Sequence, residues 1–157
     1  MTDIRKALNV FEQGIQKGQI AMISASGPVS MTVMLIKTSS DTIIPTYPLK
    51  LVTGDGEIPQ VELATPGTDL IYGLAIFNPK VSSWEDEDVF QVTTKSTVIH
   101  LKSDEKLSRG DEVGMATTAP FELIAGTSAN TIGQLLDDVE IDGIARVELW
   151  IPLTVAV

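Results

Sequence analysis

Few residues of this chain could perform catalytic chemistry, and their spacing does not favour it. His100 is the single histidine. It stands between Ile99 and Leu101, so in an extended segment its side chain points to the opposite face from theirs. A Ser-His-Asp triad also needs a nucleophile on a sharp turn, and the sequence contains no Gly-x-Ser-x-Gly motif. A zinc site with one histidine and no cysteine would need carboxylates for its other ligands. We therefore expect His100 to be a structural or surface residue.

One acidic segment has the spacing of a metal-binding loop. Asp138-x-Glu140-x-Asp142-Gly143 matches the first half of an EF-hand calcium loop, in which acidic ligands alternate and glycine stands sixth. The twelfth position of such a loop is a bidentate glutamate, and here it is Leu149. The flanking segments read as strands, whereas the motif needs helices. The sequence therefore favours a plain β-turn, with weak cation binding as the alternative.

Two further short motifs have structural explanations. Gly54-Asp55-Gly56 lacks the Lys-Ser/Thr pair and the following helix of a phosphate-binding loop. Arg109-Gly110-Asp111 spells the integrin-binding tripeptide, but Ser108 to Asp111 is also a turn signal. Paired carboxylates for glycoside hydrolysis stay open, because their separation is a spatial property. Two Trp and two Tyr give few rings to stack on sugars. We predict no catalytic, cofactor-binding or metal-binding residue.

A tryptophan stands directly before the most acidic run of the chain. Trp84 precedes Glu85 to Asp88, and such a charge run usually forms a solvated loop. The alternative is that Trp84 and the run contact a basic or apolar patch on a partner, since exposed Trp is enriched at interface hot spots. Trp84 is therefore a candidate partner contact.

Composition limits the class of partner. A net charge of -10, without a run of Lys or Arg, argues against duplex nucleic acid, since phosphate contacts need clustered basic residues. The absence of cysteine excludes disulfides and thiolate metal sites. Met1 to Lys6 lacks the apolar core of a signal peptide. The most apolar window, Ile20 to Ile36, is interrupted by polar residues and does not suit a membrane span. With 20% charged residues, the chain is expected to be soluble and to form an oligomer or assembly component.

One amphipathic helix is predicted at the start, from Thr2 to Lys17, with Gly18 at its end. Four apolar residues fall on one helical face at i, i+4, i+7 and i+11: Ile4, Leu8, Phe11 and Ile15. This stripe packs either on its own domain or on a neighbouring subunit, so these residues join Trp84 as candidate partner contacts. We divide the chain into a helix or arm, residues 1-18, and a single β domain, residues 19-157.

The remaining segments read as short strands separated by turns. Ile20 to Ile23 and Met31 to Ile36 form either a hairpin or two successive strands. Gly73 marks a bulge or a close approach. Further extended segments are expected at Leu49 to Val52, Val61 to Ala64, Leu70 to Phe77 (a candidate buried strand), Thr97 to Lys102, Val113 to Met115, Phe121 to Ile124 and Thr131 to Leu136. The segment Phe90 to Leu101 is rich in β-branched residues. In the last segment one face carries Ala145, Val147, Leu149, Ile151, Leu153 and Val155. The prediction is a mainly β fold, an antiparallel β-barrel or sandwich (a jelly roll among the options), with one N-terminal amphipathic helix.

Five short segments carry a series of motifs in chain order. After Leu49 to Val52 and Gly73 to Ala75 come Leu107-Ser108-Arg109-Gly110-Asp111-Glu112-Val113, then Ile132-Gly133-Gln134-Leu135-Leu136, then Gly143 to Leu149. This series resembles the small β-rich head-decoration, or capsid cement, proteins of tailed bacteriophages. Those proteins carry a Gly-Asp-x-Val turn, an Ile-Gly-x-Ala/Leu strand and a terminal Gly-x-x-x-Val-x-Leu strand. The resemblance spans roughly Leu49 to Leu153 and leaves out residues 1-45 and the acidic loop after Trp84.

The resemblance implies a non-enzymatic virion protein, made in the host cytoplasm, that binds the outer surface of the phage capsid. Its partner would be the major capsid protein, with a homotrimer on the capsid and no cofactor, nucleic acid or membrane. The helix and the segment Ile20 to Ile36 would supply the contacts. Two alternatives stay open: another virion component (tail, head-completion or fibre-base protein), and a ligand-binding β-barrel. One histidine speaks against a cupin-like metal site.

Overall fold

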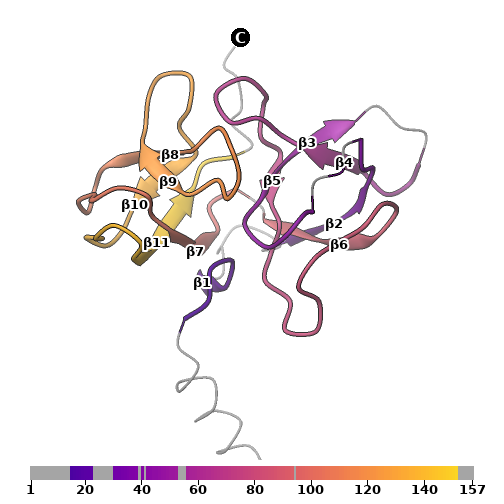
Figure 1. Ribbon diagram of the computed structural model, residues 1–157, viewed down its shortest axis with the longest axis horizontal. Coiled ribbons are helices and arrows are strands. Elements are labelled where there is room, and N and C mark those ends of the chain that lie inside the picture. The colour runs from indigo at the N-terminus through magenta and orange to yellow at the C-terminus, as the bar shows by residue number, and fades with distance from the viewer. Residues whose placement is uncertain are drawn as a thin grey trace, which may run out of the picture.

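Two β-sheets lie side by side and share one apolar core in the computed structural model of the chain (Figure 1). The structure describes residues 15–22, 30–38, 40, 42–52, 56–93 and 95–151. Within these ranges the regular elements are strands and no helix is present. It follows that no helix in this part of the chain could cross a membrane. The prediction of a mainly β fold is confirmed.

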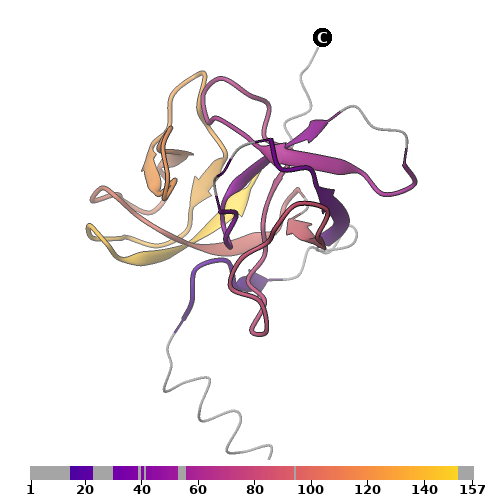
Figure 2. The ribbon, with the colours of Figure 1, turned by 45° about the vertical axis from the view of Figure 1, so that its right-hand side comes forward.

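The strands are short. In chain order they are β1 (Ile20–Met22), β2 (Ser30–Leu35), β3 (Pro48–Val52), β4 (Gln60–Leu63), β5 (Gly73–Leu74), β6 (Val89–Thr93), β7 (Val98–Lys102), β8 (Glu112–Met115), β9 (Leu123–Ala125), β10 (Gly133–Leu135) and β11 (Ile144–Leu149). Strands β1 and β7 to β11 belong to one sheet, in the order β1-β7-β11-β10-β8-β9, while β2 to β6 belong to the other, in the order β5-β3-β4-β2-β6. Figure 2, a turned view, shows the same two groups of strands.

The six-stranded sheet is antiparallel throughout, and β11 is one of its inner strands. Ala145, Val147 and Leu149 are almost fully buried, while residues between them are more exposed. Because side chains alternate across a strand, one face of β11 is apolar and packs inward. Ile151 continues this face and is also buried, so the predicted alternation is confirmed up to that residue. Leu153 and Val155 lie outside the described residues.

The five-stranded sheet is mixed, because β2 and β4 run parallel and its other pairs are antiparallel. Beyond β5, a single bridge joins Ala75 to Val92 of β6. One bridge is not a closed ladder, so in the described chain neither sheet forms a closed barrel. Gly73 confirms the predicted close approach, since a Cβ there would lie 2.9 Å from the Thr93 carbonyl oxygen.

The structure decides between arrangements that the sequence left open. The strands β1 and β2 belong to different sheets, so they are the successive strands of the two alternatives and not a hairpin. The β-branched segment Phe90 to Leu101 contains two strands, β6 and β7, which separate near Ser96, where φ is 67°, and β7 confirms the extended segment expected from Thr97 to Lys102. The predicted helix lies outside the described residues, except at Ile15 to Lys17, which are not helical.

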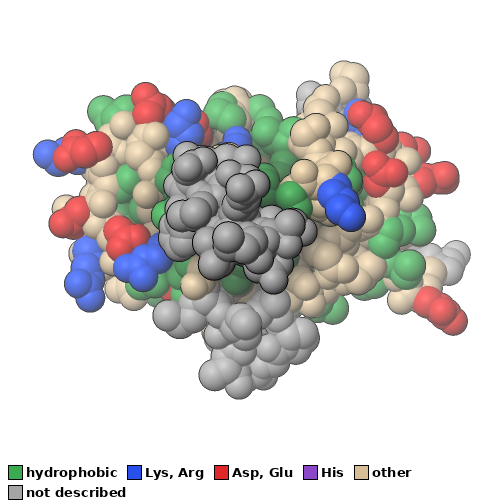
Figure 3. Space-filling model, turned by 90° about the horizontal axis from the view of Figure 1, so that it is seen from below, with side chains coloured by type: hydrophobic (Ala, Val, Ile, Leu, Met, Phe, Trp, Pro, Cys, Tyr) green, Lys and Arg blue, Asp and Glu red, His purple; other side chains and the backbone are tan. Residues whose placement is uncertain are grey.

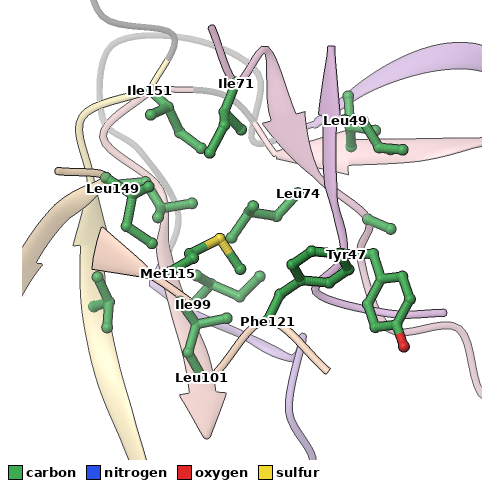
Figure 4. Close-up of a cluster of buried hydrophobic side chains, with 14 of the residues drawn as sticks. Tyr47, Leu49, Ile71, Leu74, Ile99, Leu101, Met115, Phe121, Leu149 and Ile151 are labelled. Carbon is green, nitrogen blue, oxygen red and sulfur yellow. The ribbon is translucent and has the colours of Figure 1, made fainter. Parts of the chain in front are cut away.

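The core lies where the inner faces of the two sheets meet (Figure 4). The six-stranded sheet contributes Ile99, Leu101, Met115 and Leu149, and the five-stranded sheet contributes Leu49 and Leu74. Between the sheets the rings of Tyr47 and Phe121 meet edge to face, with centroids 4.9 Å apart. Full burial of such side chains stabilises the fold by roughly 1.5–3 kcal/mol each. The contact between the sheets therefore supplies much of the folding free energy.

A buried asparagine ties a loop to the six-stranded sheet. The side-chain nitrogen of Asn130 donates to the Met115 carbonyl oxygen (2.7 Å), and its Oδ1 accepts from the Met115 N–H (3.1 Å). The side chain thus pairs with the backbone of β8 as a neighbouring strand would. Gly114 leaves room for it, because a Cβ there would lie 2.7 Å from Asn130 Oδ1.

Replacing Asn130 with Asp is expected to lower the free energy of unfolding by about 1–3 kcal/mol, since a carboxylate cannot donate to the Met115 carbonyl. Urea unfolding followed by circular dichroism measures the change. As a control, Ser128→Ala in the same loop, at an exposed position, should change it by under about 0.5 kcal/mol. Equal stability of the wild type and Asn130→Asp would contradict the assigned role.

Candidate interaction surfaces

The only histidine has a structural contact. On β7, His100 is partly buried, and its Nδ1 lies 3.0 Å from the carbonyl oxygen of Gln19. The backbone N–H of His100 donates to the same oxygen at 3.0 Å. The residue thus joins the start of β1 to β7. In the part of the chain that the structure describes, no cluster of three or more His, Cys, Asp or Glu side chains could hold a metal ion.

The segment with EF-hand spacing forms the predicted β-turn. The Gly143 N–H donates to the Glu140 carbonyl oxygen at 2.9 Å, and Asp142 has a positive φ of 65°. The acidic side chains have separate partners. Asp138 accepts from the Arg109 N–H at 2.8 Å, and Glu140 and Asp142 lie 3.7 and 3.8 Å from the Nζ atoms of two different lysines. Glu140 and Asp142 therefore pair with lysines, Asp138 accepts from a backbone N–H, and the three carboxylates do not share a partner.

The turn from Ser108 to Asp111 is also as predicted. The Asp111 N–H donates to the Ser108 carbonyl oxygen at 3.1 Å, and the Asp111 carboxylate accepts from the Ser108 N–H at 2.9 Å. Gly110 has a φ of 94°, which suits glycine. Its N–H donates to the Leu135 carbonyl oxygen at 2.8 Å. The turn is therefore attached to the end of β10.

The view that Trp84 is an exposed contact needs correction. Its side chain is 4% exposed and stacks on Phe90, with ring centroids 4.6 Å apart. The large apolar ring is held in the core, and the residues after it form the surface. Glu85 to Asp88 is an exposed turn, in which the Asp88 carboxylate accepts from the Glu85 N–H at 2.7 Å. Lys37 lies 3.2 Å from the carboxylate of Glu85.

The other predicted contacts are only partly described. Ile4, Leu8 and Phe11 lie outside the described residues. Ile15 is described, and it is 57% exposed. That exposure is unusual for a large apolar side chain in a predicted stripe, and it leaves Ile15 free to contact another surface.

Sequence reasoning missed an apolar patch at one end of the five-stranded sheet. Leu51, Leu70 and Tyr72 line a shallow hollow of about 380 Å³, and the Tyr72 hydroxyl lies 3.2 Å from Met31 Sδ. We call these four residues the Leu51–Leu70 patch. Leu51 and Leu70 are 55% and 57% exposed. Contiguous exposed apolar side chains commonly mark interaction sites.

The position of Leu51 explains why alternation did not reveal the patch. Leu49 is fully buried, and Leu51 is on the same face of β3, so the pattern predicts burial for both. However, β5 is only two residues long and pairs with β3 at Pro48 and Leu49. Leu51 therefore lies beyond the end of its neighbouring strand.

A network of charges borders the patch. Lys50 Nζ lies 3.1 Å from Asp69 and 3.5 Å from Glu62. The Thr65 N–H, which donates to Asp69 at 2.8 Å, is the main cause of the lowered pKa of that carboxyl. The hydrogen bond to Asp69 raises the pKa of Lys50, and burial raises the pKa of the Tyr72 hydroxyl. The patch is thus an apolar centre with a fixed, charged rim.

Two more hollows flank the turn from Phe77 to Val81, which extends below the sheets near β1 in Figure 1. The turn is held by a bridge between Asn78 and Val81. The hollow on the side of β6 has a volume of about 610 Å³, and the one beside Lys17 about 380 Å³. Figure 3, the view from below, shows charged side chains mostly toward the two ends of this face.

The shortest ion pair among the described residues is on the six-stranded sheet. Arg146 binds Asp137 through two side-chain hydrogen bonds of 2.9 and 2.7 Å and through its backbone N–H at 3.0 Å. The guanidinium is the main cause that lowers the pKa of Asp137 from 3.8 to about 2. Because the carboxyl is 36% exposed, water screens this pair and its contribution to stability is small.

Because the pKa of Asp137 is lower in the folded chain, the pair stabilises the fold above pH 3.8 and this contribution is lost as the pH falls toward 2. We expect the free energy of unfolding to fall less steeply over this range in Asp137→Asn than in the wild type. Urea unfolding at a series of pH values measures it. Asp104→Asn, at an exposed position, is the control and should follow the wild type. Parallel curves for the wild type and Asp137→Asn would contradict the role of the pair.

The chain matches known proteins at the level of three-dimensional structure and not of sequence. No protein-family model matches the chain, and no curated protein sequence does. Among solved structures, the fold is similar to the N base of the head fibre protein gp8.5 of bacteriophage phi29, with a TM-score of 0.54. The two are 11% identical, and the match covers 76% of this chain and 93% of that chain. The chain therefore shares the fold of this head fibre base.

Proposed function

We propose that this chain is a non-enzymatic structural protein of a bacteriophage virion, and that it binds the outer surface of the head. The observation that carries the proposal is the similarity to the base of the phi29 head fibre, which extends over 93% of that base. At 11% identity this is a similarity of fold. The motifs that resemble head-decoration proteins, such as the turn Leu107 to Val113, are a second and separate line of support.

The proposal has two forms. In the first, the chain is a capsid decoration protein, bound as a homotrimer to the major capsid protein. In the second, it is the base of a head fibre, a form that the similar structure favours. Neither form requires a cofactor, nucleic acid or membrane. They differ in copy number, since a decoration protein saturates equivalent sites over the whole shell.

We assign the head contact to the Leu51–Leu70 patch. Its exposed apolar side chains would leave water on binding, at about 25 cal/mol per Å² of apolar surface buried. Its rim of Lys50, Glu62 and Asp69 would orient the contact, as charges at the edge of an interface commonly do. Binding only to the assembled shell would stabilise that shell by mass action.

Co-sedimentation of the full chain with expanded shells tests the proposal. The shells are made from the major head protein that is encoded beside this chain. We expect saturable binding at a fixed copy number per shell, and none on unexpanded shells. Leu70→Asp should weaken binding at least about tenfold, because about 1.4 kcal/mol of lost contact corresponds to that factor.

The control is Ile141→Asp, which makes the same kind of change at a side chain that is 63% exposed in the turn between β10 and β11. It should bind as the wild type does. Equal binding by Leu70→Asp would show that the patch is not the contact. If the wild type fails to bind at any salt concentration, the head-surface function is wrong and a tail or head-completion role takes its place.

A further inference from the structure

A hollow of about 610 Å³ lies beside β6, on one side of the turn from Phe77 to Val81, and we call it the Trp84 hollow. Its walls are mostly apolar and include Ile76, Val81 and Trp84, while its polar lining consists of Asn78, Asp88 and Gln91. All of its lining lies within residues 56–93, which the structure describes without a gap. Its volume falls in the range of pockets that bind ligands, roughly 300–1,000 Å³.

The indole N–H of Trp84 is a hydrogen-bond donor without a described acceptor. The backbone N–H of Trp84 donates to the Ile43 carbonyl oxygen at 2.9 Å, and its ring stacks on Phe90, but its Nε1 donates to no described residue. Every fully buried side-chain nitrogen or oxygen of the described residues has a hydrogen-bond partner. Because the residue is nevertheless 4% exposed, its Nε1 belongs to the small part of the side chain that reaches the surface. Trp84 lines this hollow, so the free N–H opens into it.

Asp88 adds an acceptor and a negative charge to the same hollow. Its Oδ2 accepts from the Glu85 N–H at 2.7 Å, whereas its Oδ1 accepts from no described residue. Four carboxylates follow one another from Glu85 to Asp88, and among the described residues they form one ion pair, between Glu85 and Lys37 at 3.2 Å. The surface beside the hollow therefore has an excess of negative charge.

The other polar groups of the hollow are already engaged. Gln91 Nε2 donates to Thr32 Oγ1 at 2.8 Å, and Gln91 Oε1 accepts from the Ser30 hydroxyl at 2.9 Å. Asn78 Oδ1 accepts from the Lys80 N–H at 2.9 Å. A ligand would therefore find an apolar wall, one free indole N–H and one free carboxylate oxygen.

A basic residue within a peptide chain matches these three features. Its charged end can pair with Asp88, its aliphatic stem can pack on the apolar wall, and a neighbouring backbone carbonyl oxygen can accept from Trp84 Nε1–H. We propose that the Trp84 hollow binds an arginine or lysine side chain of a partner protein. The hollow shares no lining residue with the Leu51–Leu70 patch, so this contact is independent of the proposed head contact.

Charge and ring geometry favour a basic side chain over a neutral sugar. A sugar also offers donors and acceptors, but it gains nothing from the excess of negative charge. It would also need an exposed ring face on which to stack, and the ring of Trp84 is stacked on Phe90 and almost fully buried. A basic side chain uses the charge, as complementary interfaces commonly do.

Nuclear magnetic resonance titration of the full, ¹⁵N-labelled chain tests this site with N-acetyl-arginine methylamide as the probe. We expect a saturable shift of the Trp84 indole N–H signal, because that group gains an acceptor. The chain has two tryptophans, so the Trp150 indole signal is an internal reference that should stay in place. Trp150→Phe assigns the two signals. The uncharged counterpart of the probe, N-acetyl-citrulline methylamide, should bind about twofold to fivefold more weakly, the factor expected for an exposed ion pair.

Two variants of the acidic run separate the hollow from the general charge of the surface. Asp88→Asn keeps an acceptor for the Glu85 N–H, removes the charge and should raise the dissociation constant of the arginine probe about twofold to fivefold. Asp86→Asn is the matched control, since Asp86 carries the same charge and accepts from the Lys37 N–H at 2.7 Å but does not line the hollow. At physiological ionic strength it should leave the dissociation constant within about 1.5-fold of the wild type.

Equal binding of the arginine and citrulline probes would overturn the proposal, and so would an unmoved Trp84 indole signal. An equal loss for Asp86→Asn and Asp88→Asn would show attraction to the acidic run alone, which also overturns it. Tighter binding of methyl glucoside than of the arginine probe would identify a sugar site in its place. If Asp88→Asn does not fold, the comparison of the two probes on the wild type still decides whether the charge is needed.

Discussion

The contact between the inner faces of the two sheets is the constraint on which the rest of the structure depends. Each sheet has an apolar face that cannot be left in water, and each covers the other. Leu49 and Leu74 lie on one side, and Ile99, Met115 and Leu149 on the other. Strands that are mostly two to six residues long would not be stable as isolated pairs. The core is therefore what turns short strands into a domain.

The same constraint explains the apolar surface. Neighbouring strands of a sheet end at different points. Some apolar side chains therefore lie outside the region where the two sheets cover each other. Leu51 beyond the end of β5 is one case. The turn from Phe77 to Val81, with hollows on both sides, is another. These surfaces are separate, since they share no lining residue.

Alternation in the sequence predicted much of the fold, because a strand with one buried face has a period of two. β11 shows this best, since Ala145, Val147 and Leu149 are all buried. The turn at Gly110 and the one ending at Gly143 were also predictable from local chemistry. Sheet membership was not, because the pairing of β1 with β7 depends on residues about eighty positions apart. The same limit hid the division of Phe90 to Leu101 between two sheets.

The interaction sites were harder to predict than the fold. Trp84 was a candidate exposed contact because of its acidic neighbours, but it stacks on Phe90, six residues further along the chain, and is buried in the core. Leu51 gave no local signal, because its exposure depends on where β5 ends. The similarity to a head fibre base became visible only in three dimensions, since 11% identity leaves little trace in the sequence.

Electron cryomicroscopy of phage heads assembled with and without this protein tests the central claim most directly. The account predicts added density on the outer surface of the head that fits the two-sheet domain, with the Leu51–Leu70 patch against the shell. Density confined to the tail or the interior, or two indistinguishable heads, would contradict it.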